Sequence, residues 1–154
     1  MASLSVDTLR HALLDEQIQQ QRYDVAVLLQ ATSPIRPNNL IDQCIAQLVD
    51  AAADSIATFS ELPESPMRLW QIENGEAKTL FEGANPWLPR QQLPTAYHLN
   101  GLLYAFNIQK FMAQDQQPTV FFGHQLAKIT PAAVDIDTID DFEEASRLLQ
   151  QQQP

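Results

Sequence analysis

The pattern of apolar and polar positions predicts an α/β fold in the first part of the chain. Apolar residues recur at helical spacing over residues 5–20, and again from about residue 39 to residue 52. Residues 24–30 contain a continuous apolar run, which is typical of a strand covered on both faces of a sheet, and residues 54–59 predict another strand. The order helix, strand, helix, strand predicts an incomplete doubly wound, mostly parallel sheet with helices outside it.

Residues 61–96 break this pattern. They hold five prolines, and within them the sequence RLWQIENGEAKTLF predicts a β-hairpin that turns at Asn74 and Gly75. We therefore interpret residues 61–96 as an arm that leaves the main sheet. Trp70 and Trp87 either cover a partner surface or pack locally, and the sequence leaves both interpretations open.

Regular structure is predicted to resume after the arm. The expected elements are strands at 101–106, 119–122 and 126–129, and helices at 107–113 and 139–150. Thr138 and Asp141 predict the start of the last helix as a capping-box variant. Residues 151–154 are expected to be a frayed tail, and the whole chain is expected to be a single domain.

Composition narrows the classes of function. The chain has 154 residues, of which 45% are hydrophobic, and this is enough for a globular core. The net charge of −10 argues against binding to nucleic acid or to an anionic membrane surface. No segment approaches the ~20 apolar residues of a membrane span, and the N-terminus does not resemble a signal peptide, so we expect a cytoplasmic protein. The single cysteine, Cys44, is expected to be a buried hydrophobe.

Polar residues follow the most apolar strand, in the stretch YDVAVLLQATSPIRP. Gln30, Thr32 and Ser33 stand where the strand ends, which is where α/β proteins tend to bind ligands. Nearby Arg36, together with Arg68 and Arg90, stands in a loop next to proline. Proline stiffens a loop, so three arginines held this way predict an anion site; the alternative is that each binds a nearby carboxylate or carbonyl.

Two carboxylates near the C-terminus form another candidate site. In an extended segment Asp135 and Asp137 point to the same side, an arrangement that suits Mg²⁺ when substrate phosphates supply further oxygens. The alternative is that the acidic residues only start a helix, and the two readings are compatible. The sequence has no P-loop, no G-x-G-x-x-G, no G-x-S-x-G, and no histidine spacing typical of a metal site.

Three motifs, taken in order, resemble one family. LLQATSPIRP resembles that family's L-Q-P-T-S-P-L-R, RQQLPTAYHLNGLLY resembles R-Q-x-L-P-x-A-Y/F-x-x-N-G-A-I-Y, and VDIDTIDDFEEA resembles S-I-D-I-D-T-x-x-D. The family is the acylneuraminate cytidylyltransferases, or CMP-N-acetylneuraminic acid synthetases, and the resemblance covers about residues 3–150. It implies a fold of the nucleotide-diphospho-sugar transferase type, in which 61–96 is a dimerisation arm. It also implies transfer of CMP from CTP to an acidic nine-carbon sugar, with release of pyrophosphate.

The resemblance also implies roles for individual residues. Gln30, Thr32 and Ser33 would line the sugar site, and Asn100 and Tyr104 would shape its wall. The other implied ligand residues are Arg90 with Gln91 at the sugar carboxylate, Arg68 in place of a family lysine, and Asp135 and Asp137 at Mg²⁺. A homodimer is the expected assembly.

The sequence also departs from the family pattern. Ala31 replaces a proline, and His98 stands where arginine is frequent. The family's opening loop, L-A-R-x-G-S-K-x-x-x-x-K-N, which cradles the CTP phosphates, has no counterpart in these 154 residues. We therefore expect a form that lacks the N-terminal CTP-phosphate-binding part and has an uncovered edge near Val25–Leu29. The chain is then either a short cytidylyltransferase, active alone or with a second chain that supplies the missing part, or a non-catalytic sugar- or metal-binding or dimerisation module.

Overall fold

The computed structural model describes residues 2–15, 20, 22–115 and 118–151, and it confirms the α/β class. Six strands, four α-helices and two short 3₁₀ helices are described. In chain order they are α1 (Ala2–Leu13), β1 (Val25–Leu28), α3 (Leu40–Asp50), β2 (Ser55–Glu61), η1 (Pro66–Arg68), β3 (Trp70–Glu73), β4 (Glu76–Thr79), η2 (Arg90–Gln92), β5 (Tyr97–Asn107), α4 (Ile108–Met112), β6 (Gln125–Ile129) and α5 (Ile139–Gln151).

The main sheet has the strand order β1-β5-β2-β6, and its pairing corrects the prediction of a mostly parallel sheet. Only β2 and β6 pair in parallel, whereas β5 runs antiparallel to both β1 and β2. The arm causes this reversal. It leaves from the end of β2 at Glu61 and returns at Tyr97, which pairs with Glu61, so β5 must run back along β2.

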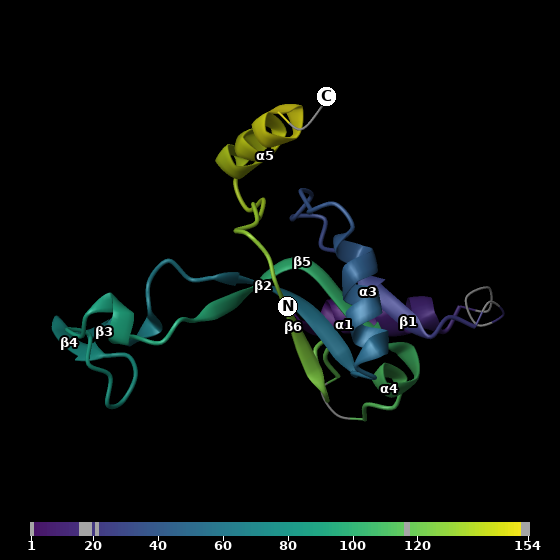
Figure 1. Cartoon of the computed structure of the whole chain (residues 1–154), viewed down its shortest axis with the longest axis horizontal. Helices are drawn as coiled ribbons and strands as arrows, with labels where there is room; N and C mark the ends of the chain where they lie inside the picture. Colours follow the sequence, from purple (N-terminus) through teal and green to yellow (C-terminus); the bar gives the residue numbers. More distant parts are fainter. Residues whose placement is uncertain (1, 16–19, 21, 116–117, 152–154) are drawn as a thin grey trace.

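Helices cover both faces of the sheet, and each face has its own apolar cluster (Figure 1). On one face Leu40, Cys44 and Leu48 of α3 pack against Ile56 and Leu103. On the other face Val6 of α1 packs with Phe106 and Phe111. Burying each large apolar side chain stabilises the fold by about 1.5–3 kcal/mol, so these clusters hold the sheet in place.

Other sequence expectations have mixed outcomes. The hairpin is confirmed, with Asn74 and Gly75 in its turn. The first helix is shifted toward the N-terminus relative to the expected 5–20, and residues 16–19 lie outside the described part of the chain. The strand expected at 119–122 is wrong. This segment is irregular because Phe122 exchanges hydrogen bonds with the Ser55 hydroxyl instead of with a strand, and it packs on Phe106 and Phe111.

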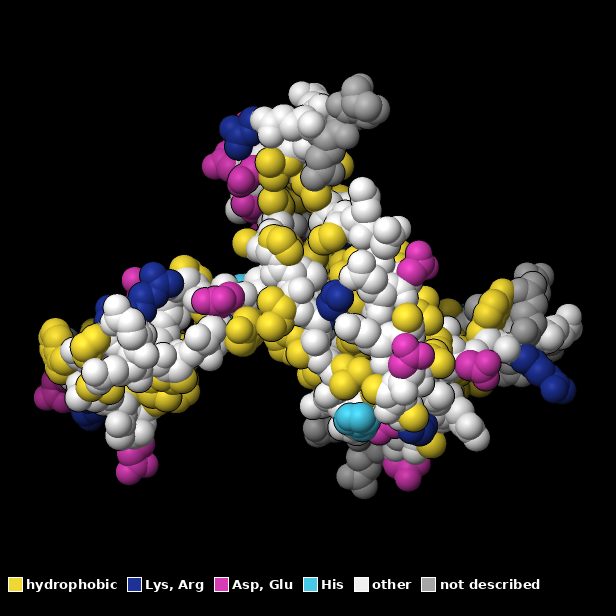
Figure 2. Space-filling view, viewed as in Figure 1, with side chains coloured by type: hydrophobic (Ala, Val, Ile, Leu, Met, Phe, Trp, Pro, Cys, Tyr) yellow, Lys and Arg dark blue, Asp and Glu magenta, His cyan; other side chains and the backbone are white. Residues whose placement is uncertain are grey.

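Two parts project from the body of the molecule. The arm extends to one side and α5 stands beyond the end of the sheet (Figure 1). Figure 2 shows hydrophobic side chains on the surface of both projections. Ile72 and Trp87 of the arm and Ile139 of α5 are 65%, 83% and 70% exposed. Within the described residues, no helix is both long and apolar enough to cross a membrane.

Candidate functional site

The loop after β1, residues 29–37, is tied to β5 by Arg36. The Arg36 Nε donates a hydrogen bond to the Leu102 carbonyl at 2.9 Å, and its Nη2 donates to the Gln30 carbonyl at 2.7 Å. Burial lowers the pKa of Arg36 from its ordinary value. The alternative role, an arginine that binds carbonyls, therefore describes Arg36: it fixes the loop that carries Gln30, Thr32 and Ser33.

Asn100 ties three strands together at this same end of the sheet. Its Nδ2 donates to Ser60 Oγ at 2.8 Å and to Thr130 Oγ1 at 2.7 Å, and its Oδ1 accepts from the Leu102 amide at 3.3 Å. The side chain is 8% exposed. Three of the four hydrogen bonds that an asparagine amide can form are thus already made inside the protein. The Asn100 side chain thus holds this end of the sheet together from within.

The segment 130–137 comes from β6 and crosses the 29–37 loop. The Ile136 amide donates to the Thr32 carbonyl at 2.8 Å, so the loop and the segment share a backbone hydrogen bond. Burial raises the pKa of Tyr104, and the negative charge of nearby Asp135 raises it further. The loop after β1, the first half of β5 and the segment after β6 therefore meet at one end of the sheet.

A cavity of about 390 Å³ lies beside the end of β1, on the side of the sheet that Val6 of α1 covers, and two of the predicted ligand residues, Gln30 and Tyr104, line it. No residue of the 130–137 segment, all of which the structure describes, lines this cavity. We call it the sugar-side cavity; it is lined by Val6, Leu28, Gln30, Leu99, Tyr104, Pro118, Thr119, Val120 and Phe121. The lining is mostly apolar with a few polar groups, as is usual for small-molecule sites. Sequence reasoning missed residues 118–121, because an irregular segment has no periodicity to mark the face that it presents.

Ser33 is a residue of the 29–37 loop, and its hydroxyl lies near Gly101 and the Gln30 side chain. Its side chain is fully buried, and Ser33 Oγ has no hydrogen-bond partner among the residues that the structure describes. Most buried hydroxyls in proteins are hydrogen-bonded, so an unpaired one needs an explanation. Its neighbours are the Gln30 side chain and Gly101.

Arg68, Arg90 and Gln91 lie in the arm, and none of the three lines the sugar-side cavity. Arg68 Nη2 donates to the Leu88 carbonyl at 3.1 Å, and Arg90 Nη2 donates to the Pro63 carbonyl at 3.4 Å. Both arginines line a separate cavity of about 140 Å³ with Glu64 and Ser65. The structure thus brings these two arginines to each other but not to Gln30 or Tyr104.

Asp135 and Asp137 lie in the exposed segment before α5. The expected capping box is confirmed: the Thr138 amide donates to Asp141 Oδ2 at 2.8 Å, and the Asp141 amide donates to Thr138 Oγ1 at 3.3 Å. Hydrogen bonds that Asp141 Oδ2 accepts from the Thr138 hydroxyl, the Thr138 amide and the Asp137 amide lower the pKa of Asp141, and the hydroxyl bond is the largest cause. No group of three or more acidic, histidine or cysteine side chains suited to a metal occurs among the described residues. Asp135 and Asp137 therefore fit Mg²⁺ only as two of its ligands, with the other oxygens supplied by a bound substrate or water.

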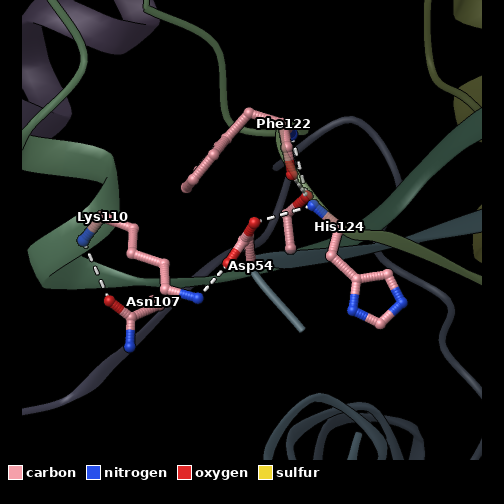
Figure 3. Close-up of polar contacts among 6 residues, drawn as sticks. Asp54, Asn107, Lys110, Phe122 and His124 are labelled. Atoms are coloured by element: carbon pink, nitrogen blue, oxygen red, sulfur yellow. Dashed lines mark hydrogen bonds and ion pairs between the residues drawn. The ribbon is translucent and has the colours of Figure 1, made fainter. Parts of the chain in front are cut away.

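A polar cluster at the opposite end of the sheet has a structural role (Figure 3). Asp54 accepts a hydrogen bond from the His124 amide at 2.7 Å and forms an ion pair with Lys110. These contacts lower the pKa of Asp54, with the Lys110 hydrogen bond as the largest cause. They fasten α4 and the chain that enters β6 to the start of β2.

Comparisons with known proteins agree with the predicted resemblance. No family model matches the chain. Two N-acylneuraminate cytidylyltransferases of Streptococcus agalactiae, from serotype V and serotype III strains, are each 28% identical over 139 residues, which is 90% of this chain and 32% of each relative. A pseudaminic acid cytidylyltransferase of Campylobacter jejuni is 24% identical over 94% of this chain and 62% of its own length.

A solved structure shares the fold. It is a CMP:2-keto-3-deoxy-manno-octonic acid synthetase complexed with CTP, with a TM-score of 0.60 and 14% identity over 96% of this chain and 68% of that one. The chain spans about a third of the length of the Streptococcus relatives. The resemblance to acylneuraminate cytidylyltransferases is confirmed, and with it a relationship to the wider group of CMP-transferring enzymes.

Proposed function

We propose that this chain carries the acidic-sugar side of a cytidylyltransferase site, where CMP passes from CTP to an acidic nine-carbon sugar and pyrophosphate is released. The observation that carries the proposal is the sugar-side cavity, in which Gln30 and Tyr104 meet close to Asp135. The names of the relatives support the reaction class, since they include cytidylyltransferases for N-acylneuraminate and for pseudaminic acid. Their names differ in the acid, so the proposal extends to the class of sugar only.

In this reaction a sugar hydroxyl oxygen attacks the α-phosphorus of CTP, and the bond from that phosphorus to the bridging oxygen breaks. Pyrophosphate leaves, and the hydroxyl proton must be accepted by a nearby base. Asp135 and Asp137 would hold Mg²⁺, which when bound offsets charge on the triphosphate. In the proposal Gln30, Thr32 and Ser33 orient the sugar, Tyr104 forms the wall, and the apolar side of the cavity excludes water.

The sugar carboxylate needs a cation, and the proposed ones lie in the arm. Arg68 and Arg90 share a cavity that does not include Gln30, so they can reach a sugar bound at Gln30 only if the arm meets a second copy of the chain. A homodimer is therefore part of the proposal. The exposure of Trp70, Ile72 and Trp87 supports it, because a surface with several large apolar side chains commonly marks a protein interface.

CTP binding is proposed to need residues beyond these 154. No stretch of the sequence resembles the phosphate-cradling loop, and β1 pairs on one side only among the described strands. In the proposal a further segment or a second chain supplies the phosphate-binding half and pairs with the free edge of β1. The proposed location is the cytoplasm, in keeping with the free buried thiol of Cys44.

A thermal-shift measurement tests the proposal. N-acetylneuraminic acid at ~100 times its Kd should stabilise the chain by about 2.7 kcal/mol. Gln30→Ala should weaken binding and so reduce the shift at the same sugar concentration, while Gln71→Ala in the hairpin should keep it. No shift with any acidic nine-carbon sugar would overturn the proposed function.

The alternative is a non-catalytic sugar-binding or dimerisation module. The lack, in these 154 residues, of a stretch that resembles the phosphate-cradling loop favours it. An assay for CMP-sugar from CTP and Mg²⁺, with the chain alone and with a supplied phosphate-binding half, distinguishes the two. A sugar-induced shift without product in either assay would support the module.

A further inference from the structure

We propose that Gly101 is a positioning residue that fixes the side-chain amide of Gln30 in the sugar-side cavity, with Asn100 as its anchor. The inference rests on the proposed function for the identity of the ligand, but its structural part stands on contacts within the chain. The Gln30 side chain can pack against the Gly101 backbone only because residue 101 has no side chain. This contact therefore gives Gly101 a role beyond that of a turn.

The Gln30 side chain occupies the space that a side chain at residue 101 would need. A Cβ built on Gly101 overlaps the Gln30 amide oxygen, lies 3.0 Å from Gln30 Cδ and lies 3.3 Å from Ser33 Oγ. The Gln30 amide and the Ser33 hydroxyl therefore converge on one face of the Gly101 backbone. This is a close approach that any larger residue would prevent.

The backbone under this contact is held firmly. Gly101 has a φ of +72°, and it stands between Asn100, which forms three hydrogen bonds within the core, and Leu102, whose carbonyl accepts from Arg36. The Gln30 carbonyl is held as well, because it accepts from Arg36 Nη2 and from the Ser33 amide. Arg36 thus fixes the backbone on both sides of the contact, at Gln30 and at Leu102 next to Gly101.

This arrangement explains how an exposed glutamine can be ready for a ligand. A free glutamine side chain samples many rotamers and loses that freedom when it binds. The surface of Gly101 restricts Gln30 before binding, so less freedom is lost when a sugar hydroxyl or acylamido group arrives. Ser33 Oγ lies at the same point, fully buried and with no partner among the described residues, and Ser33 does not itself line the cavity.

The chain provides a matched control at Gly75. It also has a positive φ, +84°, but a Cβ built there meets no atom within 4 Å. Gly75→Ala therefore reports the cost of a positive φ alone, whereas Gly101→Ala reports that cost plus the contact with Gln30. Any excess effect of Gly101→Ala that disappears in a Gln30→Ala background belongs to the contact.

NMR of the ¹⁵N-labelled chain tests the contact without a ligand. The Gln30 side-chain NH₂ pair is assigned by its loss in Gln30→Ala, and we expect it to show a nuclear Overhauser effect to the Gly101 Hα protons. It should shift in Gly101→Ala and stay in place in Gly75→Ala. A Gln30 pair with no effect to Gly101 and no response to Gly101→Ala would overturn the inference, even if the Gly101 variant proves too unstable for other work.

Titration with N-acetylneuraminic acid tests the role in binding. We expect Gly101→Ala to weaken the Kd by about tenfold, a coupling within the range that residues in contact show. Gly75→Ala should leave the Kd unchanged, and Gly101→Ala should add no weakening in the Gln30→Ala background. Equal weakening in both backgrounds would overturn the inference. If the wild-type chain binds no acidic sugar, the proposed function fails, and the NMR contact alone then decides whether Gly101 positions Gln30.

Discussion

Asparagines in the body of the molecule and in the arm differ in their burial and in the hydrogen bonds that they form. At the sheet end, Asn100 is 8% exposed and its amide forms three hydrogen bonds with residues on β2, after β6 and on β5. In the arm, Asn85 is exposed and its side chain accepts one bond from the Trp87 amide, two residues along the chain. The body is organised by contacts between different elements of the main sheet and its helices, and the arm by contacts among residues 61–96.

One sequence motif crosses the boundary between these regions. RQQLPTAYHLNGLLY begins in the arm with Arg90 and Gln91 and ends in the body with Asn100, Gly101 and Tyr104. At the arm end of the motif, Arg90 donates to the Pro63 carbonyl. At the body end, Tyr104 lines the sugar-side cavity. A continuous motif can therefore serve two sites, and only a second copy would bring its halves together in the proposed function.

The largest effect should come from the core of the body. Phe106→Ala removes a fully buried ring that lies 4.6 Å from Phe111 between ring centroids, and it should destabilise the protein by about 3–5 kcal/mol. The arm counterpart is Trp87→Ala, where the side chain is 83% exposed and the loss should be below about 0.5 kcal/mol for the monomer. Urea unfolding measures both. Similar losses at the two positions would contradict the contrast.

A smaller effect should come from the buried polar anchor. Asn100→Ala leaves the hydroxyls of Ser60 and Thr130 without their shared partner, and we expect a loss of about 2–3 kcal/mol. Asn85→Ala removes one exposed bond and should cost about 0.5 kcal/mol or less. If urea midpoints move equally for the two variants, Asn100 is not the anchor that the structure indicates.

A pH-dependent effect should separate the far end of the body from the arm. Hydrogen bonds from Lys110 and His124 hold the pKa of Asp54 below its ordinary value, so ionised Asp54 stabilises the folded state above the ordinary aspartate pKa. That contribution is lost as the pH falls through the lowered pKa of the folded state. Asp54→Asn should therefore flatten the fall in stability below about pH 4, the ordinary range of aspartate. A wild-type and variant pair with parallel acid unfolding curves would argue against this role.

The smallest effect on stability, with a large effect on assembly, should come from the arm. Trp87→Glu places a charge on its exposed apolar surface, where the Trp70 and Trp87 ring centroids lie 6.4 Å apart. The monomer should unfold within about 0.5 kcal/mol of wild type, but the proposed dimer should dissociate. Light scattering on size-exclusion fractions measures the mass. A variant that keeps the wild-type mass at the same concentration would show that this part of the arm is not the interface.

Local features were predictable from the sequence, and non-local ones were not. The hairpin at Asn74 and Gly75 and the capping box of Thr138 and Asp141 depend on neighbours in sequence, and both are confirmed. The packing question for Trp70 and Trp87 has a mixed answer, since the rings contact each other and stay exposed. The direction of β5 depends on where the arm returns, which periodicity does not encode.

The candidate site shows the same division. The polar strand end pointed to Gln30 and the family resemblance pointed to Tyr104, and the two residues line one cavity. The sequence left open whether the three loop arginines form a joint anion site or each bind a nearby group. In the structure Arg36, Arg68 and Arg90 each donate to a backbone carbonyl. The sequence could not identify these carbonyls, because each lies at least six residues away from its arginine. The cavity wall at 118–121 was missed, since it becomes a wall only when it packs against the sheet.

The most direct test of the central claim is an NMR titration of the ¹⁵N-labelled chain with N-acetylneuraminic acid. The account predicts shift changes at Gln30, Gly101, Tyr104 and the 119–121 segment, with the hairpin residues 70–79 unchanged. Shift changes confined to the arm, or none at millimolar sugar, would contradict the claim that this end of the sheet is the sugar side of a CMP-transfer site.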